Sequence, residues 1–163
     1  MKSKINRRGE KLNLEQLGLF GVFLAGAIPW FEAIVAVPAG ILFGLDPILT
    51  VIFAIAGNII TIVIFAYGGK SLRNWVIRRR VAKGQEPESP KFKKAQVAYA
   101  KYGIYVMAIL DPILIGSPFS AAASVAAGVR PLKAILVISA GMVIWAVAIA
   151  WVFVALGISV FEA

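Results

Sequence analysis

The chain has 163 residues, of which 60% are hydrophobic, and its 17 Lys and Arg against 8 Asp and Glu give a formal net charge of +9. One soluble core of this size cannot bury so large an apolar share, so much of the chain is predicted to lie in lipid. The sequence has no cysteine and no histidine, which excludes disulfides and thiolate or imidazole metal sites, and no cofactor or metal is expected.

The first hydrophobic stretch, Leu17–Leu45, is interrupted several times. The interruptions are Pro29, Glu32, Pro38, Gly40 and Gly44. Each piece between them is too short for a comfortable crossing of a bilayer. Non-helical backbone at membrane depth must be buried in protein or line a wet cavity, so this stretch predicts a re-entrant hairpin with breaks at Pro29, Pro38 and Gly40.

Two uninterrupted runs are long enough to cross a membrane. The first extends from Pro47 to Gly69 and the second from Ala134 to Phe161, and neither contains a charged residue. Each is longer than the roughly 20 residues that a transmembrane helix needs. With the broken stretches counted, the chain has about four hydrophobic passes.

A basic connector, residues 70–101, separates two hydrophobic blocks and contains ten Lys and Arg. It carries the helix breakers Gly84, Pro87 and Pro90, and "LRNWVIRRRVAKG" has the spacing of an amphipathic helix at the membrane surface. Because the charge borders hydrophobic segments, we expect contacts with anionic lipid head groups and none with nucleic acid.

The positive-inside rule places this connector in the cytoplasm. Five further bases lie between Lys2 and Lys11. If both hairpins are re-entrant, these bases lie on the opposite side. Three alternatives then stay open: a full crossing by the first stretch, an overruled tail charge, or insertion in both orientations.

The second broken stretch, "LDPILIGSPFSAAASVAAGVRP", contains Pro112 and predicts hairpin breaks at Gly116 and Pro118. The small residues after the break either form a close packing face or line a path.

The sequences of the two blocks can be aligned with a constant difference in residue number. The identical pairs then include Gly44 with Gly128, Pro47 with Pro131, and Gly57 with Gly141. Chance similarity is the alternative, but Pro- and Gly-interrupted segments at matching places are typical of transporters built from repeats.

The sequence therefore predicts an all-α integral membrane protein made of a single membrane domain. It has two hydrophobic repeats, residues 12–69 and 102–161. Each repeat is a broken, re-entrant helical hairpin followed by a transmembrane helix, and the basic amphipathic connector joins them.

Ionisable side chains in apolar sequence are costly, so they are candidates for function. Glu32 lies near the tip of the first hairpin, and Asp111 precedes Pro112 at the matching break of the second. We expect these two carboxyl groups to face each other and to carry protons, with Arg130 as a counter-ion or substrate anchor. The alternatives are that Asp111 caps a helix or marks an interfacial turn, and that Asp46 and Arg130 end their segments at the head groups.

Asn58 either lines the same path or joins helices by a hydrogen bond. Enzyme signatures are missing: there is no HExxH, CxxC, phosphate loop or nucleophile elbow, so no enzymatic activity is expected.

"PWFEAIVAVPAGILFGLDP", the later "AGN" and "IGSPFSAAASVAAG" resemble the small multidrug export proteins of bacterial and archaeal membranes. These look distantly related to the DedA and VTT-domain superfamily. Their acidic residue before Pro-x-Gly maps onto Glu32, Pro38 and Gly40. An Arg that often follows the acid in relatives is absent here, where Ala33 and Ile34 stand.

The resemblance implies two re-entrant hairpins and a role in transport or lipid scrambling. Three hypotheses follow. The first is a transporter of small or amphipathic solutes, coupled to protons and acting as a homodimer. The second is a DedA-like lipid flippase in which Arg130 and Lys133 meet the head group. The third is a non-transporting membrane scaffold.

Overall fold

The computed structural model describes residues 2–87 and 90–158, whose regular secondary structure consists of α-helices alone. The helices are α1 (Lys2–Ala27), α2 (Glu32–Leu42), α3 (Pro47–Ala82), α4 (Pro90–Leu114), α5 (Ser117–Ala126) and α6 (Pro131–Ala155). Helix α4 consists of two helical parts, because Gly103 leaves the helical region with φ +70 and ψ 172.

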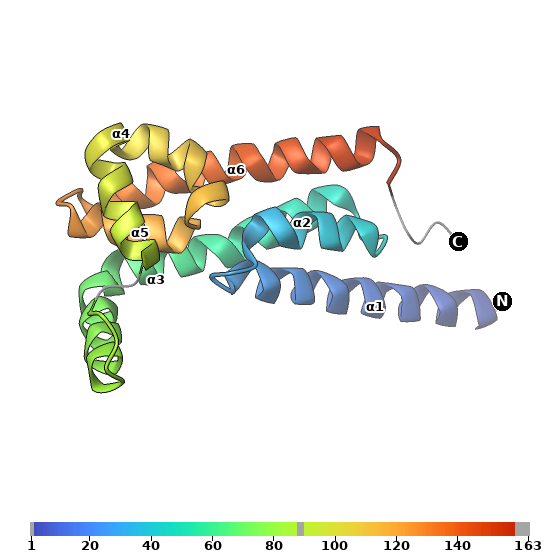
Figure 1. Ribbon diagram of the computed structural model, residues 1–163. Helices are drawn as coiled ribbons and strands as arrows, with labels where there is room; N and C mark the ends of the chain where they lie inside the picture. Colours follow the sequence, from blue (N-terminus) through green and yellow to red (C-terminus); the bar gives the residue numbers. More distant parts are fainter. Residues whose placement is uncertain (1, 88–89, 159–163) are drawn as a thin grey trace.

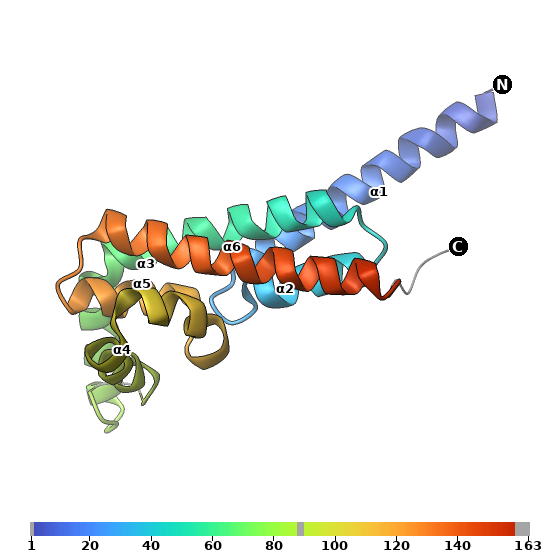
Figure 2. The same cartoon turned by 90° about the horizontal axis from the view of Figure 1, so that it is seen from above.

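Helices α3 and α6 pack together and run in opposite directions, as the colour order along each helix shows in Figures 1 and 2. Asp46 caps α3 by accepting a 2.9 Å hydrogen bond from the backbone N–H of Leu49. Both α3 and α6 have a proline in the first turn, where the missing backbone N–H of proline costs little.

Two segments of the described chain are long and apolar enough to cross a membrane: Pro47–Gly68 of α3 and Pro131–Ala155 of α6. In the most apolar window of each, only 33% of the residues are buried inside the chain. The rest of this apolar surface faces outward, as expected of helices that lie in lipid.

The prediction of about four passes differs from this count. The other apolar helices in the described chain are shorter: Leu14–Ala27, Glu32–Leu42 and Tyr102–Ile113. The predicted helix up to Phe161 is also too long. Helix α6 ends at Ala155, where Gly157 follows in the left-handed region with φ +61, and residues 159–163 lie outside the described residues.

The shorter helices form two hairpins. Helices α1 and α2 are joined by a turn at residues 28–31, and the second part of α4 is joined to α5 by a turn at residues 115–116. Figure 1 shows the two hairpins toward opposite ends of α3 and α6, with their turns near the middle. Figure 2 shows the same meeting of the turns from above.

Glycines bring each hairpin close to a long helix. A Cβ on Gly57 of α3 would overlap the carbonyl oxygen of Phe23 in α1, and a Cβ on Gly141 of α6 would overlap that of Ala108 in α4. Small residues allow such close approach between helices in membranes. Each hairpin is thereby seated on the long helix of its own block.

The predicted breaks at Pro38 and Gly40 are wrong, because α2 runs through both residues. Pro38 removes one N–H in this 11-residue helix, and the helix continues past it. Gly40 has a packing role instead: a Cβ there would lie 2.9 Å from the side chain of Val22 and closer still to Thr50. Pro118 lies in the first turn of α5, while Pro29 and Gly116 lie in the turns themselves.

Positions that are paired in the alignment of the two blocks also have similar backbone conformations. Glu32 and Gly116, which the alignment pairs, stand at the start of α2 and α5, and both have positive φ, +51 and +100. Gly44 and Gly128 follow the ends of the same helices with φ +76 and +94. The two blocks therefore match helix by helix from Glu32 to the start of each long helix.

Matching side chains also tie each hairpin to its long helix. The hydroxyl of Thr61 in α3 donates a 2.6 Å hydrogen bond to the carbonyl of Ala27, at the end of α1. At the matching position of the second block, the indole of Trp145 in α6 donates a 2.8 Å bond to the carbonyl of Ile109 in α4. Carbonyls near the end of a hairpin helix need such partners where water is scarce.

The connector begins as a continuation of α3, which stays helical to Ala82. In Figure 1 this last part of α3 bends away from the rest of the helix. The following loop is held by Arg80, whose Nε donates a 2.8 Å bond to the carbonyl of Glu86, and by an ion pair between Lys93 and the Glu86 carboxylate.

Candidate functional site

Glu32 is the first residue of α2 and lies at the turn of the first hairpin. Its backbone is left-handed (φ +51), and its side chain is buried, with the residue 5% exposed. A left-handed backbone costs a residue with a side chain about 1–2 kcal/mol. Strain of this kind persists where the surrounding structure holds it, and it is frequent at functional sites.

The Glu32 carboxylate contacts the turn of the second hairpin. The hydroxyl of Ser117 donates a 3.3 Å hydrogen bond to Glu32 Oε2, joining residues 85 positions apart. On the other side, a Cβ on Gly116 would overlap Glu32 Oε1. Only glycine suits position 116, because the residue needs both a positive φ and the absence of a side chain.

Asp111, near the end of α4, is the second acid at this junction and is 0% exposed. It lies close enough to Glu32 for the two carboxyl groups to interact electrostatically, and the hydroxyls of Ser117 and Ser120 lie beside it. Within the described chain, neither Asp111 oxygen has a hydrogen bond of standard geometry. A buried carboxyl group without such bonds is costly when it is ionised.

The other predicted residues differ in their surroundings. Asn58 is 0% exposed on α3, which packs against both α2 and α5, and its amide has no hydrogen-bond partner among the described residues. Arg130 is exposed just before α6, and the structure does not bring it to the two acids. Asp46 is not buried either, and it caps α3.

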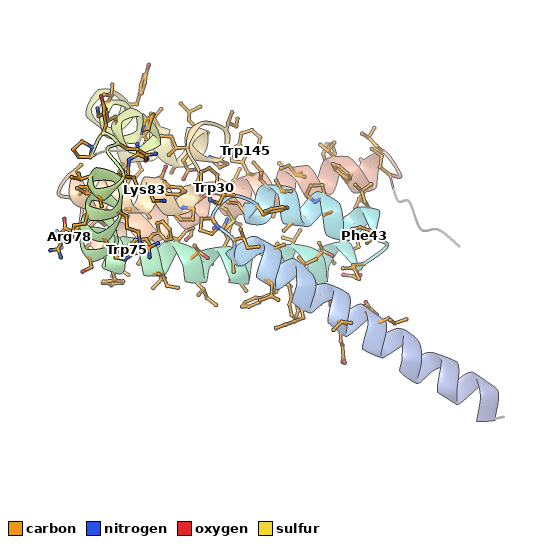
Figure 3. All side chains as sticks on the ribbon, turned by 60° about the horizontal axis from the view of Figure 1, so that its bottom comes forward. Trp30, Phe43, Trp75, Arg78, Lys83 and Trp145 are labelled. Carbon is orange, nitrogen blue, oxygen red and sulfur yellow. The ribbon has the colours of Figure 1, made fainter. Side chains whose placement is uncertain are left out.

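A pocket of about 140 Å³ lies between the two turns. Its lining comes from both hairpins: Pro29, Trp30, Phe31, Glu32, Ile34, Pro112, Ile113, Ile115 and Gly116. Figure 3 shows Trp30 between Trp75 and Phe43 along the length of the helices. The Trp30 ring meets Phe119 of α5 edge to face, with the ring centroids 5.7 Å apart.

Sequence reasoning missed Trp30, Ser117, Ser120 and Phe119 at this site. Serines and aromatic residues are common in membrane helices, so their presence gave no signal by itself. Their position did offer one. Trp30 follows Pro29 directly, and "SPFS" follows Gly116, so all four lie beside hairpin turns.

Comparison with known proteins points to one family. The profile of the family described as "Putative small multi-drug export protein" matches residues 32–148. The match begins at Glu32 and includes Asp111, all of α5 and most of α6. No match to the chain is found among curated proteins or among solved structures.

Proposed function

This chain belongs to the small multi-drug export protein family, and on that premise we propose that it is a membrane transporter of small or amphipathic solutes. The observation that carries the proposal is the junction of the two hairpin turns, where Glu32 and Asp111 are both buried and close enough to interact electrostatically, and where Glu32 lines a pocket. Buried acids in membrane proteins are most often parts of transport pathways.

The proposed architecture is a pair of re-entrant hairpins related by an inverted repeat. Three observations support it: the matching conformations of the two blocks, the opposite directions of α3 and α6, and the hairpins at opposite ends in Figure 1. In transporters built this way, the substrate site lies where the repeats meet, near the middle of the bilayer.

Proton coupling follows from the chemistry of the acids. Two neighbouring carboxyl groups in dry surroundings are costly as two negative charges, so the pair is expected to hold a proton. Ser117 donates a hydrogen bond to Glu32, and the hydroxyls of Ser117 and Ser120 lie beside Asp111, so each acid has a donor near it when it is ionised. Release and uptake of this proton would couple solute movement to a pH gradient.

The test is solute flux in proteoliposomes under an imposed pH gradient. Wild-type protein is expected to show flux that follows the gradient, and Glu32→Gln is expected to abolish it because the amide cannot release a proton. Glu86→Gln is the matched control, since Glu86 is an exposed acid of the connector. It is expected to retain wild-type flux.

Two results would count against the proposal. Equal gradient-driven flux from wild-type protein and Glu32→Gln would remove the acid from the mechanism. A change in stability or assembly alone, with no flux from any form of the protein, would favour the scaffold hypothesis.

A DedA-like lipid flippase is the second candidate, favoured by the basic residues at the start of α6. Arg130 is exposed there, and the Lys133 ammonium lies 5.1 Å from the centroid of the Tyr105 ring. Both are positioned to meet a phosphate head group. Movement of a fluorescent lipid that is independent of the pH gradient and is lost in Arg130→Gln would support this function over the first.

The connector is proposed to lie at the cytoplasmic surface against anionic lipid. Its side chains in α3 suit such a surface: Trp75 and Arg79 are exposed, and the Arg79 guanidinium lies 4.2 Å from the centroid of the Trp75 ring. Figure 3 shows Trp75, Arg78 and Lys83 together at one end of the molecule. A homodimer is proposed as well, because two spanning helices are few for a closed pathway.

A further inference from the structure

The pocket between the hairpin turns has a buried acid and an exposed apolar rim. Glu32 is 5% exposed, whereas Trp30, Phe31 and Ile113 are 65%, 52% and 63% exposed. The pocket is therefore enclosed at the Glu32 carboxylate and open at its apolar rim, toward the surroundings of the helices. In a membrane, these surroundings are lipid.

The charge of the pocket selects between kinds of ligand. Glu32 is the one charged residue in its described lining, and no basic side chain contributes to that lining. Asp111 adds a second acid next to Glu32. Such a site attracts a cation and repels a phosphate or sulfate group.

The aromatic residues fit the same ligand. Trp30 and Phe31 contribute rings to the lining beside the carboxylate. Ring faces attract ammonium groups, and aromatic rings are how proteins recognise quaternary ammonium ions. The Trp30 ring is in edge-to-face contact with Phe119.

The size of the pocket limits what can enter it. Its volume of about 140 Å³ is close to that of an engineered cavity of roughly 150 Å³ that holds one benzene molecule. A compact head group fits, but a long apolar tail does not. The tail of an amphipathic molecule would have to lie outside, along the exposed rim at Ile113 and in the lipid beyond it.

We infer that this pocket binds the cationic head group of an amphipathic molecule that enters sideways from the bilayer. The Glu32 carboxylate is its counter-ion, the Trp30 and Phe31 rings surround the positive charge, and the tail stays in lipid. This inference rests on the proposed function and names the substrate class of the same site.

Binding of radiolabelled decyltrimethylammonium to the full chain in nanodiscs tests the inference, with empty nanodiscs subtracted. Decyl sulfate is the matched probe, because it has the same tail and the opposite charge. Saturable binding of the cation alone is expected. Saturable binding of both probes with similar affinity would overturn the inference, because the tail would then account for it.

Two variants locate the site. Glu32→Gln is expected to weaken binding of the cation at least about tenfold, as the loss of a charged partner does. Trp30→Leu is expected to weaken it about 2- to 25-fold, which is the range of a cation–π contact. Trp151→Leu and Glu86→Gln are the matched controls, since Trp151 is 71% exposed on α6 and Glu86 is exposed in the connector.

Trp30→Leu keeps the test decisive even if Glu32→Gln fails to fold, because Trp30 is largely exposed. Wild-type affinity in Trp30→Leu and in a folded Glu32→Gln would overturn the site.

The experiments distinguish failure of this inference from failure of the proposed transport function. Gradient-driven flux of another solute that requires Glu32, without binding of the cation, would remove only the inference. Binding of the cation without any flux would support the site and remove the transport function.

Discussion

Glu32 and Gly116 occupy matching positions of the two blocks with left-handed backbones, yet one is a strained acid and the other an unstrained glycine. The charge of Glu32 within apolar sequence is enough to mark it as a candidate for function. Its contact with Gly116 could not be predicted in the same way. Glycines are frequent in this chain, 15 of 163 residues, so a single glycine does not reveal that it meets an acid.

Gly116→Ala is expected to destabilise the protein more than Gly128→Ala. Both glycines have positive φ, +100 and +94, so each alanine brings a backbone strain of about 1–2 kcal/mol. Only at position 116 would the new Cβ also overlap Glu32 Oε1, whereas position 128 has open space around it. This overlap is expected to add about 1–3 kcal/mol.

The measurement is thermal unfolding of the purified variants in detergent, followed by circular dichroism. Gradient-driven flux of the same variants shows whether the lost contact also affects function. Equal losses of stability in Gly116→Ala and Gly128→Ala would mean that the Glu32 carboxylate does not pack against Gly116 as described.

At the scale of helices, the sequence predicted the start of α3 and the turns at Pro29 and Gly116, but it placed the start of the second long helix at Ala134 instead of Pro131 and a break inside α2. Pro47 and Pro131 mark helix starts because a proline in the first turn costs little. Pro38 resembles a break in the sequence, although α2 continues past it. Gly40 was predicted as a break as well, but it lies inside α2 and allows close contact with Thr50 of α3.

Gly57→Ala is expected to destabilise the protein by about 1–3 kcal/mol, because the added Cβ overlaps the carbonyl oxygen of Phe23 and forces α1 away from α3. Gly68→Ala, in the same helix, is the matched control. A Cβ at Gly68 meets nothing within 4 Å, so this change is expected to be neutral or to stabilise by up to about 1 kcal/mol.

Unfolding in increasing sodium dodecyl sulfate at fixed total detergent, followed by circular dichroism, gives both stability differences. A loss in Gly57→Ala that does not exceed the change in Gly68→Ala would contradict the close contact between α1 and α3.

For the whole molecule, the sequence predicted a membrane helical chain with matching blocks. It also predicted that Glu32 and Asp111 face each other, but not that Ser117 and Gly116 contact the Glu32 carboxylate. That information lies in the packing of α2 and α5 against α3, which depends on small residues far apart in the chain. Arg130 shows the same limit: its charge suggested a partner for the acids, but its place before α6 leaves it exposed.

The chain contains no cysteine, so single introduced cysteines report its topology directly. Under the proposed architecture, Phe43→Cys and Leu156→Cys lie at one membrane face, and Lys83→Cys and Leu132→Cys lie at the other. All four positions are exposed. A membrane-impermeant maleimide applied to intact cells is expected to label only the first pair. Labelling of all four positions would indicate insertion in both orientations, and labelling of Phe43→Cys together with Lys83→Cys alone would contradict a crossing by α3.

The hydrogen bonds of Thr61 and Trp145 lie within the two halves of the molecule, while helices of different halves also pack together, α3 against α5 and α6, and α2 against α6. Within each half, the hairpin is fastened to its own long helix by a bond of 2.6 Å or 2.8 Å and by a glycine contact. Across the turns, the bond from the Ser117 hydroxyl to the Glu32 carboxylate is longer, at 3.3 Å. The Glu32 side chain thus joins the two hairpin turns, so a change at this one carboxylate acts on both blocks.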